Sequence, residues 1–354
     1  MGTIIGRTRK DGTTAYVAQI LLKRKGKIVH RESQTFDRKQ VARAWLARRE
    51  TEFAEGIVDR SKDVRLSDVI DRYVRESERQ IGRTKAQVLA KIKEYDIANL
   101  RCSEIKSEHL VEFARSLKMQ PQTRANYLSH LAAIFRIARP LWGHPLDLQQ
   151  IQDAMVAMRK LGTIAKGNSR DRRPTLGELD RILTHFETIR AHRPRSLPMA
   201  KITAFAIFST RRQEEITRLT WADYDKVAGR VWVRDMKNPG DKKGNHVLCE
   251  LTPEAANIMD SMSRTGPEIF PFSTDAISAA FTRACQQLEI NDLRFHDLRH
   301  EGVSRLFEMG RTIPQVAVVS GHRSWNSLQR YTHLRQTGDK YGNWPWFSAV
   351  TVAD

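Results

Sequence analysis

The change in residue pattern near residue 60 constrains the fold of this chain more than any other feature. Before it, runs rich in β-branched and aromatic residues alternate with glycine-bearing turns, which is typical of strands. After it, residues 61–160 repeat apolar side chains every three or four positions and show few strand signals, which predicts helices. The chain has 354 residues, enough for two or three domains. We therefore expect a multidomain α+β protein.

Residues 1–60 are predicted to form a small sheet backed by one helix. Residues 13–22 and 28–36 have strand patterns joined by a basic turn, and Ile4-Ile5 adds a third short strand. After Asp37, apolar side chains recur at helical spacing. A basic sheet can lay its strands in a DNA major groove, although a solvated basic hairpin has the same pattern. The basic residues concentrated here are Arg7, Arg9, Lys10, Lys23, Arg24, Lys25 and Lys27.

Residues 61–160 predict a bundle of four or five helices. Apolar residues recur at helical spacing in residues 66–74, 110–117 and 122–135, and the last of these stretches keeps polar residues on its other face. Such a bundle could grip DNA through Lys85, Lys91, Lys93 and Arg124, although the pattern alone indicates only a helical bundle. Residues 161–174 carry glycines and a basic run without periodicity. We interpret them as a linker that lets the flanking domains close around a duplex.

The net charge points to a polyanionic partner. Lys and Arg number 60 against 41 acidic residues, which gives a formal charge of +19 and a pI near 10.1. Nucleic acid is the natural partner of such a chain, although a basic balance also serves general solubility. Cys102, Cys249 and Cys285 lack metal-ligand spacing and are expected to be buried thiols. Because no long apolar run exists, we expect no membrane segment and a cytoplasmic location.

Residues 175–354 are predicted to form a mainly α-helical domain with a β-hairpin. Residues 175–178 read as a capping box that opens the first helix. Strand-like residues 230–233 and 246–251 bracket a segment rich in lysine and glycine. Arg212 and Glu215 lie three residues apart, as neighbours on a helix do, and a simple helix ion pair would have the same spacing. Further on, His296 and Arg299 share one helix face.

The stretch from Gly310 to Leu334 places His322 nine residues before Tyr331. Ser324 is expected to cap a short helix that ends near this tyrosine. A phenol titrates near pH 10, so it becomes a useful nucleophile near neutrality only among bases and cations. Tyr341 is the rival nucleophile, in a tail rich in Gly, Lys and Trp.

The C-terminal half holds six polar groups in a distinctive order: Arg212, Lys237, His296, Arg299, His322 and Tyr331. Their patterns are RxxEI followed by a leucine, a lysine before a turn, HDLRH at 296–300, and GH nine residues before the tyrosine. In this ordered set the chain resembles the tyrosine recombinases, the bacteriophage integrase family, over about residues 175–335. Family members commonly have Thr-Gly-x-Arg where residues 209–212 read Ser-Thr-Arg-Arg. The interval to Glu215 favours Arg212 over Arg211 as the family's arginine.

Each of these groups suits transfer of a phosphodiester. Two guanidiniums, Arg212 and Arg299, can bind the nonbridging oxygens, whose charge grows in the transition state. Tyr331 would attack the phosphorus, and His296 is a candidate base for its proton or a group that orients the phosphate. His322 would donate a hydrogen bond to a phosphate oxygen.

The departing 5′ oxygen needs a proton, which Lys237 would supply, with Lys242 and Lys243 as rivals. His300 is expected to pack or hydrogen-bond within the site rather than act chemically. The product would be a 3′-phosphotyrosyl link with a free 5′-hydroxyl, and attack by another 5′-hydroxyl would rejoin strands. Because the protein link keeps the bond energy, we expect neither ATP, a cofactor nor a metal ion.

The resemblance implies a domain order and a set of partners. It predicts an arm-type DNA-binding sheet domain at 1–60, a helical core-binding domain at 61–160, a basic linker at 161–174 and a catalytic domain at 175–354. The expected partners are double-stranded DNA at specific recombination sites, a homotetramer on synapsed DNA and an accessory DNA-bending protein. The implied location is a bacterial host cell, on the nucleoid when bound. The apolar tail at 344–347 is expected either to fold back on its own domain or to dock on a neighbouring protomer.

Several functions share these features. The leading one is an integrase encoded by a phage or another mobile element, because the N-terminal sheet could bridge a second class of DNA site. A recombinase for DNA inversion or resolution has the same chemistry. A catalytically idle DNA-binding protein would keep the fold without needing Tyr331. A relaxing enzyme like the type IB topoisomerases is less consistent with the three-part layout and the apolar tail.

Overall fold

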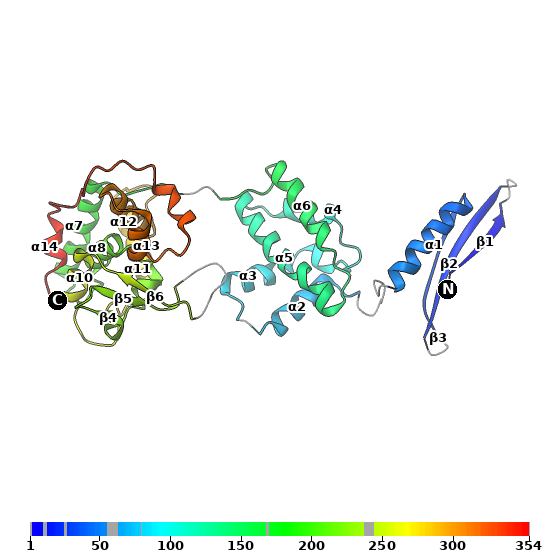
Figure 1. Ribbon diagram of the computed structural model, residues 1–354, viewed down its shortest axis with the longest axis horizontal. Coiled ribbons are helices and arrows are strands. Elements are labelled where there is room, and N and C mark those ends of the chain that lie inside the picture. The colour runs from blue at the N-terminus through cyan, green and yellow to red at the C-terminus, as the bar shows by residue number, and fades with distance from the viewer. Residues whose placement is uncertain are drawn as a thin grey trace. The chain divides into compact units, whose positions relative to one another are not determined.

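The structure is a computed structural model in which the chain forms two units, Met1–Asn168 and Ser169–Asp354. It describes residues 2–9, 13–24, 27–54, 63–78, 80–167, 170–236 and 244–353, without the side chains of 22–24, 27–30 and 52–54. Figure 1 labels the elements of each unit. Among the helices it describes, none combines the length and continuous hydrophobicity that a bilayer-spanning helix needs.

The first unit begins with the predicted sheet. Strands β1 (Gly2–Thr8), β2 (Thr14–Arg24) and β3 (Lys27–Phe36) pair antiparallel in the order β1-β2-β3, so the short third strand is confirmed. Helix α1 (Lys39–Ala54) packs on one face (Figure 1). Small residues allow this close approach: Ala18 and Ala42 are fully buried, and a Cβ at Gly2 would collide with Leu46.

The rest of the first unit is a helical bundle. Its helices are α2 (Leu66–Glu76), α3 (Arg83–Ile92), α4 (Ser107–Ser116), α5 (Pro121–Trp142) and α6 (Leu148–Lys160), with a 3-10 turn, η2 (Asp96–Asn99), between α3 and α4. Proline opens α5 and Gly143, at φ 71°, ends it. The buried face of α5 supplies Leu128, Leu131, Ile134 and Phe135 to the core.

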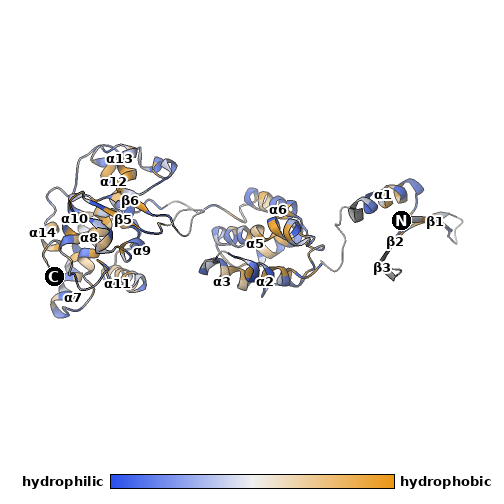
Figure 2. Ribbon diagram, turned by 60° about the horizontal axis from the view of Figure 1, so that its bottom comes forward, coloured by the Kyte–Doolittle hydropathy of each residue, from blue (hydrophilic) through white to orange (hydrophobic). Residues whose placement is uncertain are grey.

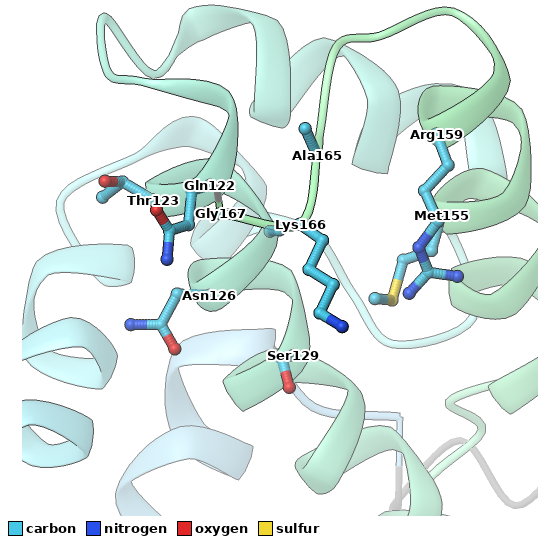
Figure 3. Close-up of a pocket in the computed structure, with 10 residues that line it drawn as sticks. Gln122, Thr123, Asn126, Ser129, Met155, Arg159, Ala165, Lys166 and Gly167 are labelled. Carbon is cyan, nitrogen blue, oxygen red and sulfur yellow. The ribbon is translucent and has the colours of Figure 1, made fainter. Parts of the chain in front are cut away.

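An open hollow of about 900 Å³ lies beside the first turns of α5. Gln122, Asn126 and Ser129 line it from α5, Arg159 from α6, and Lys166 from the segment that follows α6 (Figure 3). Amides, a hydroxyl and two cations therefore share one concave surface, and no acidic side chain is among the residues that line it.

The second unit is built around α8 (Met199–Ser209), all of whose residues are buried and which Figure 2 colours largely as hydrophobic. Helices α7 (Leu176–His192), α10 (Pro253–Asp260) and α12 (Asp297–Glu308) pack on it. The remaining elements are α9 (Gln213–Ile216), η3 (Trp221–Asp223), α11 (Thr274–Gln287), α13 (Ile313–Ser320), η4 (Trp325–Ser327), η5 (Gln329–Tyr331) and α14 (Trp346–Val350).

The predicted β-hairpin of the second unit is present as β5 (Arg230–Val233) and β6 (Val247–Glu250), which pair antiparallel. A two-residue strand, β4 (Tyr224–Asp225), which the sequence did not suggest, extends it to three strands. The capping box at Thr175 and Glu178 is also present, with each side chain bonded to the other residue's backbone N–H.

The apolar tail folds back on its own unit. Trp344 is buried, and its ring lies 5.7 Å from that of Phe208 and 5.2 Å from that of Tyr341. Phe347 also packs on Phe208, at 6.1 Å. In this single chain the tail packs within its own unit, and its docking on a neighbouring protomer stays a prediction. All three cysteines are free and buried, as the sequence predicts.

Candidate active site

A close crossing of two helices creates the site. A Cβ at Gly302 on α12 would lie 1.9 Å from the carbonyl oxygen of Ile207 on α8, so only glycine permits the approach. At the end of α8, Thr210 turns the chain with φ 56°, a left-handed conformation that disfavours β-branched residues. Thr210 thus adopts a backbone conformation that glycine, the residue common at this position of the family's motif, favours. After this turn, residues 211 and 212 point in different directions.

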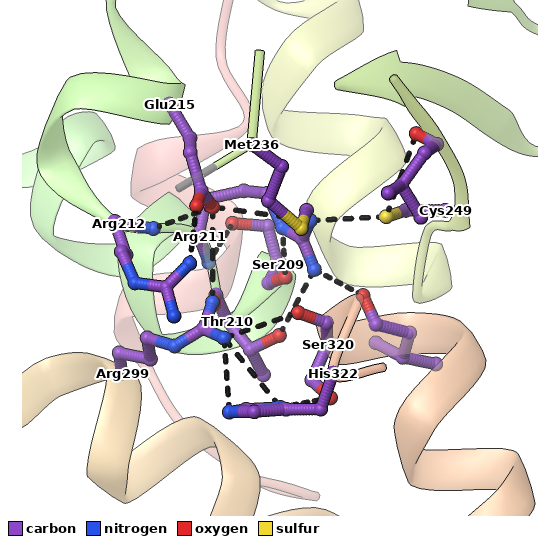
Figure 4. Close-up of polar contacts among 12 residues, drawn as sticks. Ser209, Thr210, Arg211, Arg212, Glu215, Met236, Cys249, Arg299, Ser320 and His322 are labelled. Atoms are coloured by element: carbon purple, nitrogen blue, oxygen red, sulfur yellow. Dashed lines mark hydrogen bonds and ion pairs between the residues drawn. The ribbon is translucent and has the colours of Figure 1, made fainter. Parts of the chain in front are cut away.

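The two arginines after this turn play different parts (Figure 4). Arg211 is fully buried and donates to the carbonyls of Ser209 and Val319 and to the sulfur of Cys249, 3.0 Å away. Arg212 precedes α9, and its side chain is 29% exposed. A substrate can reach the guanidinium of Arg212, whereas Arg211 ties α8 to β6 and α13.

Glu215 is the buried carboxylate shared by these guanidiniums. Its oxygens lie 2.6 Å from Arg212, 3.7 Å from Arg299 and 4.0 Å from Arg211. Burial opposes its ionisation, but the three arginines together hold the pKa of Glu215 below its ordinary value. In the described structure, three arginines thus surround one carboxylate. The excess positive charge can bind a phosphate group.

Arg299, on the first turn of α12, is 4% exposed and donates to the carbonyls of Thr210 and Ser320. Burial lowers its pKa to about 9, which leaves it charged at pH 7. Its Nη2 lies 3.2 Å from Nε2 of His322, whose Nδ1 is 2.7 Å from the hydroxyl of Ser320. Burial, and then the nearby arginines, lower the pKa of His322 to about 3, so its imidazole is neutral at pH 7.

Two histidines lie along the start of α12. His296 immediately precedes the helix and His300 follows one turn later, with their rings 5.1 Å apart. Burial lowers the pKa of both, that of His300 to about 4. Nδ1 of His300 lies 2.5 Å from the phenol oxygen of Tyr331. The neutral imidazole of His300, not that of His296, therefore contacts the predicted nucleophile.

Tyr331 ends η5 and is 7% exposed. It stacks on Phe307 at 6.0 Å, and the guanidinium of Arg330 lies 5.4 Å from its ring. Burial raises the pKa of its phenol, while the neighbouring arginines oppose that rise. The preceding segment forms two 3-10 turns, η4 and η5, instead of the single short helix that the sequence suggested after Ser324.

The rival tyrosine occupies a different environment. Tyr341 is 5% exposed, and its hydroxyl donates to the buried carboxylate of Glu301 at 3.1 Å. Burial and that carboxylate raise the pKa of Tyr341 strongly. Lys237 and its rivals Lys242 and Lys243 lie outside the described residues.

Residues 173–337 match the phage integrase family model. A shufflon-specific DNA recombinase of Escherichia coli is 32% identical over 260 residues, which make up 69% of this chain and 62% of that protein. Residues 173–337 therefore belong to the phage integrase family. An integrase of Salmonella phage P22 is 26% identical over 157 residues, 39% of each protein. The chain thus spans less than two thirds of the length of these two relatives.

Solved structures share the fold of this chain. A lambda integrase tetramer bound to a Holliday junction matches with a TM-score of 0.57 and 17% identity over 90% of this chain and 95% of that one. A Tn1549 transposon integrase bound to circular intermediate DNA matches with a TM-score of 0.58 and 13% identity over 75% and 94%. At these identities the likeness concerns the fold, which is helix-rich with small sheets.

Many of the residues predicted to contact DNA have intramolecular partners. In the helical bundle, Lys85 donates to the hydroxyl of Tyr73, Lys91 pairs with Glu94, and Lys93 pairs with Asp71. Arg124 donates to the carbonyls of Leu117 and Thr163 and so links three segments of the bundle.

The N-terminal sheet contains the other predicted contacts. Arg7 is exposed, and Arg9 pairs with Asp37 at 2.6 Å. Lys10 and Lys25 lie outside the described residues, as do the side chains of Lys23, Arg24 and Lys27. Their contact with DNA stays a prediction.

The expected hydrogen bonding of His300 within the site is confirmed, and the structure identifies Tyr331 as its partner. Glu215 forms the expected ion pair with Arg212 and also lies near Arg299, a contact that the sequence did not suggest. The signal for His300 was present, because positions 296 and 300 are one helical turn apart and face the same side. Its contact with Tyr331 joins segments 31 residues apart, which no local pattern reports.

Proposed function

We propose that this chain is a site-specific DNA recombinase that cuts and rejoins strands through a covalent link to Tyr331. The contact between His300 and the Tyr331 phenol, next to the surplus guanidiniums of Arg212 and Arg299, carries this proposal. This arrangement places a nucleophile, a neutral base and a binding site for an anionic transition state together in one unit.

The roles follow from the geometry. The phenol oxygen of Tyr331 bonds to the phosphorus as its proton passes to Nδ1 of His300, and the bond from phosphorus to the 5′ oxygen breaks. His300 takes this part in place of His296, which lies one turn earlier and is left to orient the phosphate.

The guanidiniums of Arg212 and Arg299 bind the nonbridging oxygens, and Glu215 holds both in place. His322 donates one N–H to the phosphate, and Lys237 protonates the departing 5′ oxygen. The phosphotyrosyl link keeps the energy of the broken bond, so rejoining needs only a 5′-hydroxyl. The proposed reaction uses neither ATP nor a divalent ion.

The first unit is proposed to grip the duplex. The hollow beside α5 offers amides that can pair with base edges, while Arg159 and Lys166 at its rim can meet phosphates. The N-terminal sheet would bind a second class of DNA site through its basic residues, among them Arg7. A homotetramer on synapsed DNA is proposed from the named lambda integrase assembly. A DNA-bending protein and a place on the bacterial nucleoid complete this proposal.

The test uses a duplex that carries a binding site selected by the protein itself, with a nick that lets the cut fragment diffuse away. Wild type, Tyr331→Phe and Tyr341→Phe are incubated with labelled duplex in EDTA and run on a denaturing protein gel. We expect a protease-sensitive labelled adduct with wild type and Tyr341→Phe but not with Tyr331→Phe. An adduct that persists in Tyr331→Phe refutes the nucleophile. Tight binding without any adduct identifies an idle DNA-binding protein.

Joined products distinguish the remaining outcomes. A plasmid pair with one selected site each reports integration. A single plasmid with two sites reports inversion or deletion according to their orientation.

A further inference from the structure

The segment Arg170–Arg173, which we call the entry strap, is the first described part of the second unit. The sequence placed it at the end of a linker. In the structure, each of its four side chains forms an ion pair within the second unit. A flexible linker would not need these ion pairs. They indicate that the strap has a structural role in the second unit.

One side of the strap is fixed to α12. Arg170 donates to both carboxylate oxygens of the buried Asp297, at 3.1 and 2.8 Å. Arg173 pairs with Glu301 at 2.8 Å and with Glu308 at 2.7 Å. Paired guanidinium contacts to buried carboxylates are well-defined and hard to displace. Because Asp297 lies between His296 and Arg299, the strap is anchored where the site residues of α12 begin.

The other side of the strap contacts the residue before the nucleophile. Arg330 donates to the backbone carbonyl of Arg170 at 2.5 Å and to the carboxylate of Asp171. Tyr331 itself ends the short 3-10 turn η5, in which its N–H donates to the carbonyl of Leu328 at 3.0 Å. Short 3-10 turns are weak by themselves, so contacts from outside decide where such a segment lies.

We propose that Asp171 and Arg170 are positioning residues that hold Tyr331 against His300. Arg170 fixes the strap to the first turn of α12, and Asp171 fixes Arg330 to the strap. The phenol of Tyr331 and its base, His300, come from different elements. Both elements are thereby fixed to the same segment, the entry strap. Alignment of reacting groups contributes strongly to rate, and small displacements are costly. This inference rests on the proposed function, in which Tyr331 is the nucleophile.

Charge reversal at Asp171 tests the proposal. This side chain is 81% exposed, so Asp171→Lys should fold, but its ammonium would repel Arg330. The added cation cannot weaken attraction to DNA, so a slower reaction would not reflect lost binding. We expect single-turnover adduct formation to slow about tenfold with unchanged or tighter DNA binding. Glu187→Lys on α7, with the same charge change, serves as the control and should react at the wild-type rate.

A second variant separates positioning from a general loss. Arg330→Ala removes the repelled group, so Asp171→Lys combined with Arg330→Ala should react no more slowly than Arg330→Ala alone. Asp171→Glu, which keeps the carboxylate, should retain most of the wild-type rate. Independent, multiplying losses would show that the two side chains do not act through each other and would overturn the proposal.

Hydrogen exchange gives a readout that does not depend on catalysis. In the DNA-free protein, backbone amides of residues 329–334 should exchange several times faster in Asp171→Lys than in wild type, and those of α8 should not change. If the wild type forms no adduct, the proposed function fails. The exchange result still shows whether Asp171 holds residues 329–334 in place. Unchanged exchange at 329–334, or a wild-type rate for Asp171→Lys in an active protein, refutes the positioning role.

Discussion

Nδ1 of His300 lies 2.5 Å from the phenol oxygen of Tyr331, although HDLRH and the tyrosine come from separate elements of the unit. Burial of the imidazole keeps it unprotonated near neutrality, with a pKa of about 4. Burial also raises the pKa of the phenol, so Tyr331 does not ionise by itself and needs a base at contact distance. His300 is the described group at that distance and is the proposed base.

Replacement of His300 should therefore slow the first chemical step. We expect His300→Gln to reduce the single-turnover rate of adduct formation about 100-fold, the usual contribution of a general base, with little change in DNA affinity. His192→Gln, at the exposed end of α7, provides the control. A wild-type rate for His300→Gln, together with a large loss of rate for His296→Gln, would show that His296 is the general base.

Loss of the buried charge at Glu215 should destabilise the second unit. Glu215→Gln leaves the buried guanidiniums of Arg211 and Arg299 without their carboxylate, and removal of one partner from such a group costs about 3 kcal/mol. The neighbouring Glu214 is exposed and lies 4.0 Å from Arg218, so Glu214→Gln should change the free energy of unfolding by less than about 0.5 kcal/mol. Urea denaturation of both variants measures the difference. Equal stabilities would contradict the shared role of Glu215.

A methyl group at the helix crossing should be poorly tolerated. Gly302→Ala places a Cβ 1.9 Å from the carbonyl oxygen of Ile207, so α8 and α12 must separate, at a cost of about 3 kcal/mol. Gly177→Ala on α7 meets nothing within 4 Å and should stabilise the protein by about 0.5 kcal/mol, because alanine favours a helix. Thermal unfolding of the two variants should move in opposite directions. A neutral Gly302→Ala would show that the crossing is looser than described.

Acidification should destabilise the second unit before its carboxylates titrate. The folded pKa values of His300 and His322, about 4 and about 3, lie below the ordinary 6.5, so the unfolded chain binds their protons more readily. This contribution is fully present above about pH 6.5. It is lost progressively as the pH falls from about 6.5 to the folded values, below which the folded protein also binds the protons. Between pH 7 and 5, each histidine should remove about 2 kcal/mol. Urea denaturation at both pH values should show a smaller difference for His300→Gln than for wild type, and equal differences would refute this origin.

Local patterns in the sequence were enough to place most elements. Alternation and turn residues predicted the N-terminal strands, and Thr175 with Glu178 marked the start of α7. These features depend on contacts between residues close in the chain, so spacing reports them. The two-residue strand β4 and the 3-10 turns before Tyr331 were missed, because such short elements are held by tertiary contacts and carry little pattern of their own.

The sequence by itself determined which chemical groups are available and in what order, because the intervals around Arg212, Arg299, His322 and Tyr331 place them on local elements. Tertiary structure alone decided how they are used. Contacts with Cys249 and Val319 hold Arg211 in the core, the fold brings His300 to the phenol, and the entry strap docks beside Arg330. Each of these outcomes depends on burial and on contacts between distant segments. Spacing along the chain favoured Arg212 over Arg211, but it does not encode which distant segments surround a buried polar group.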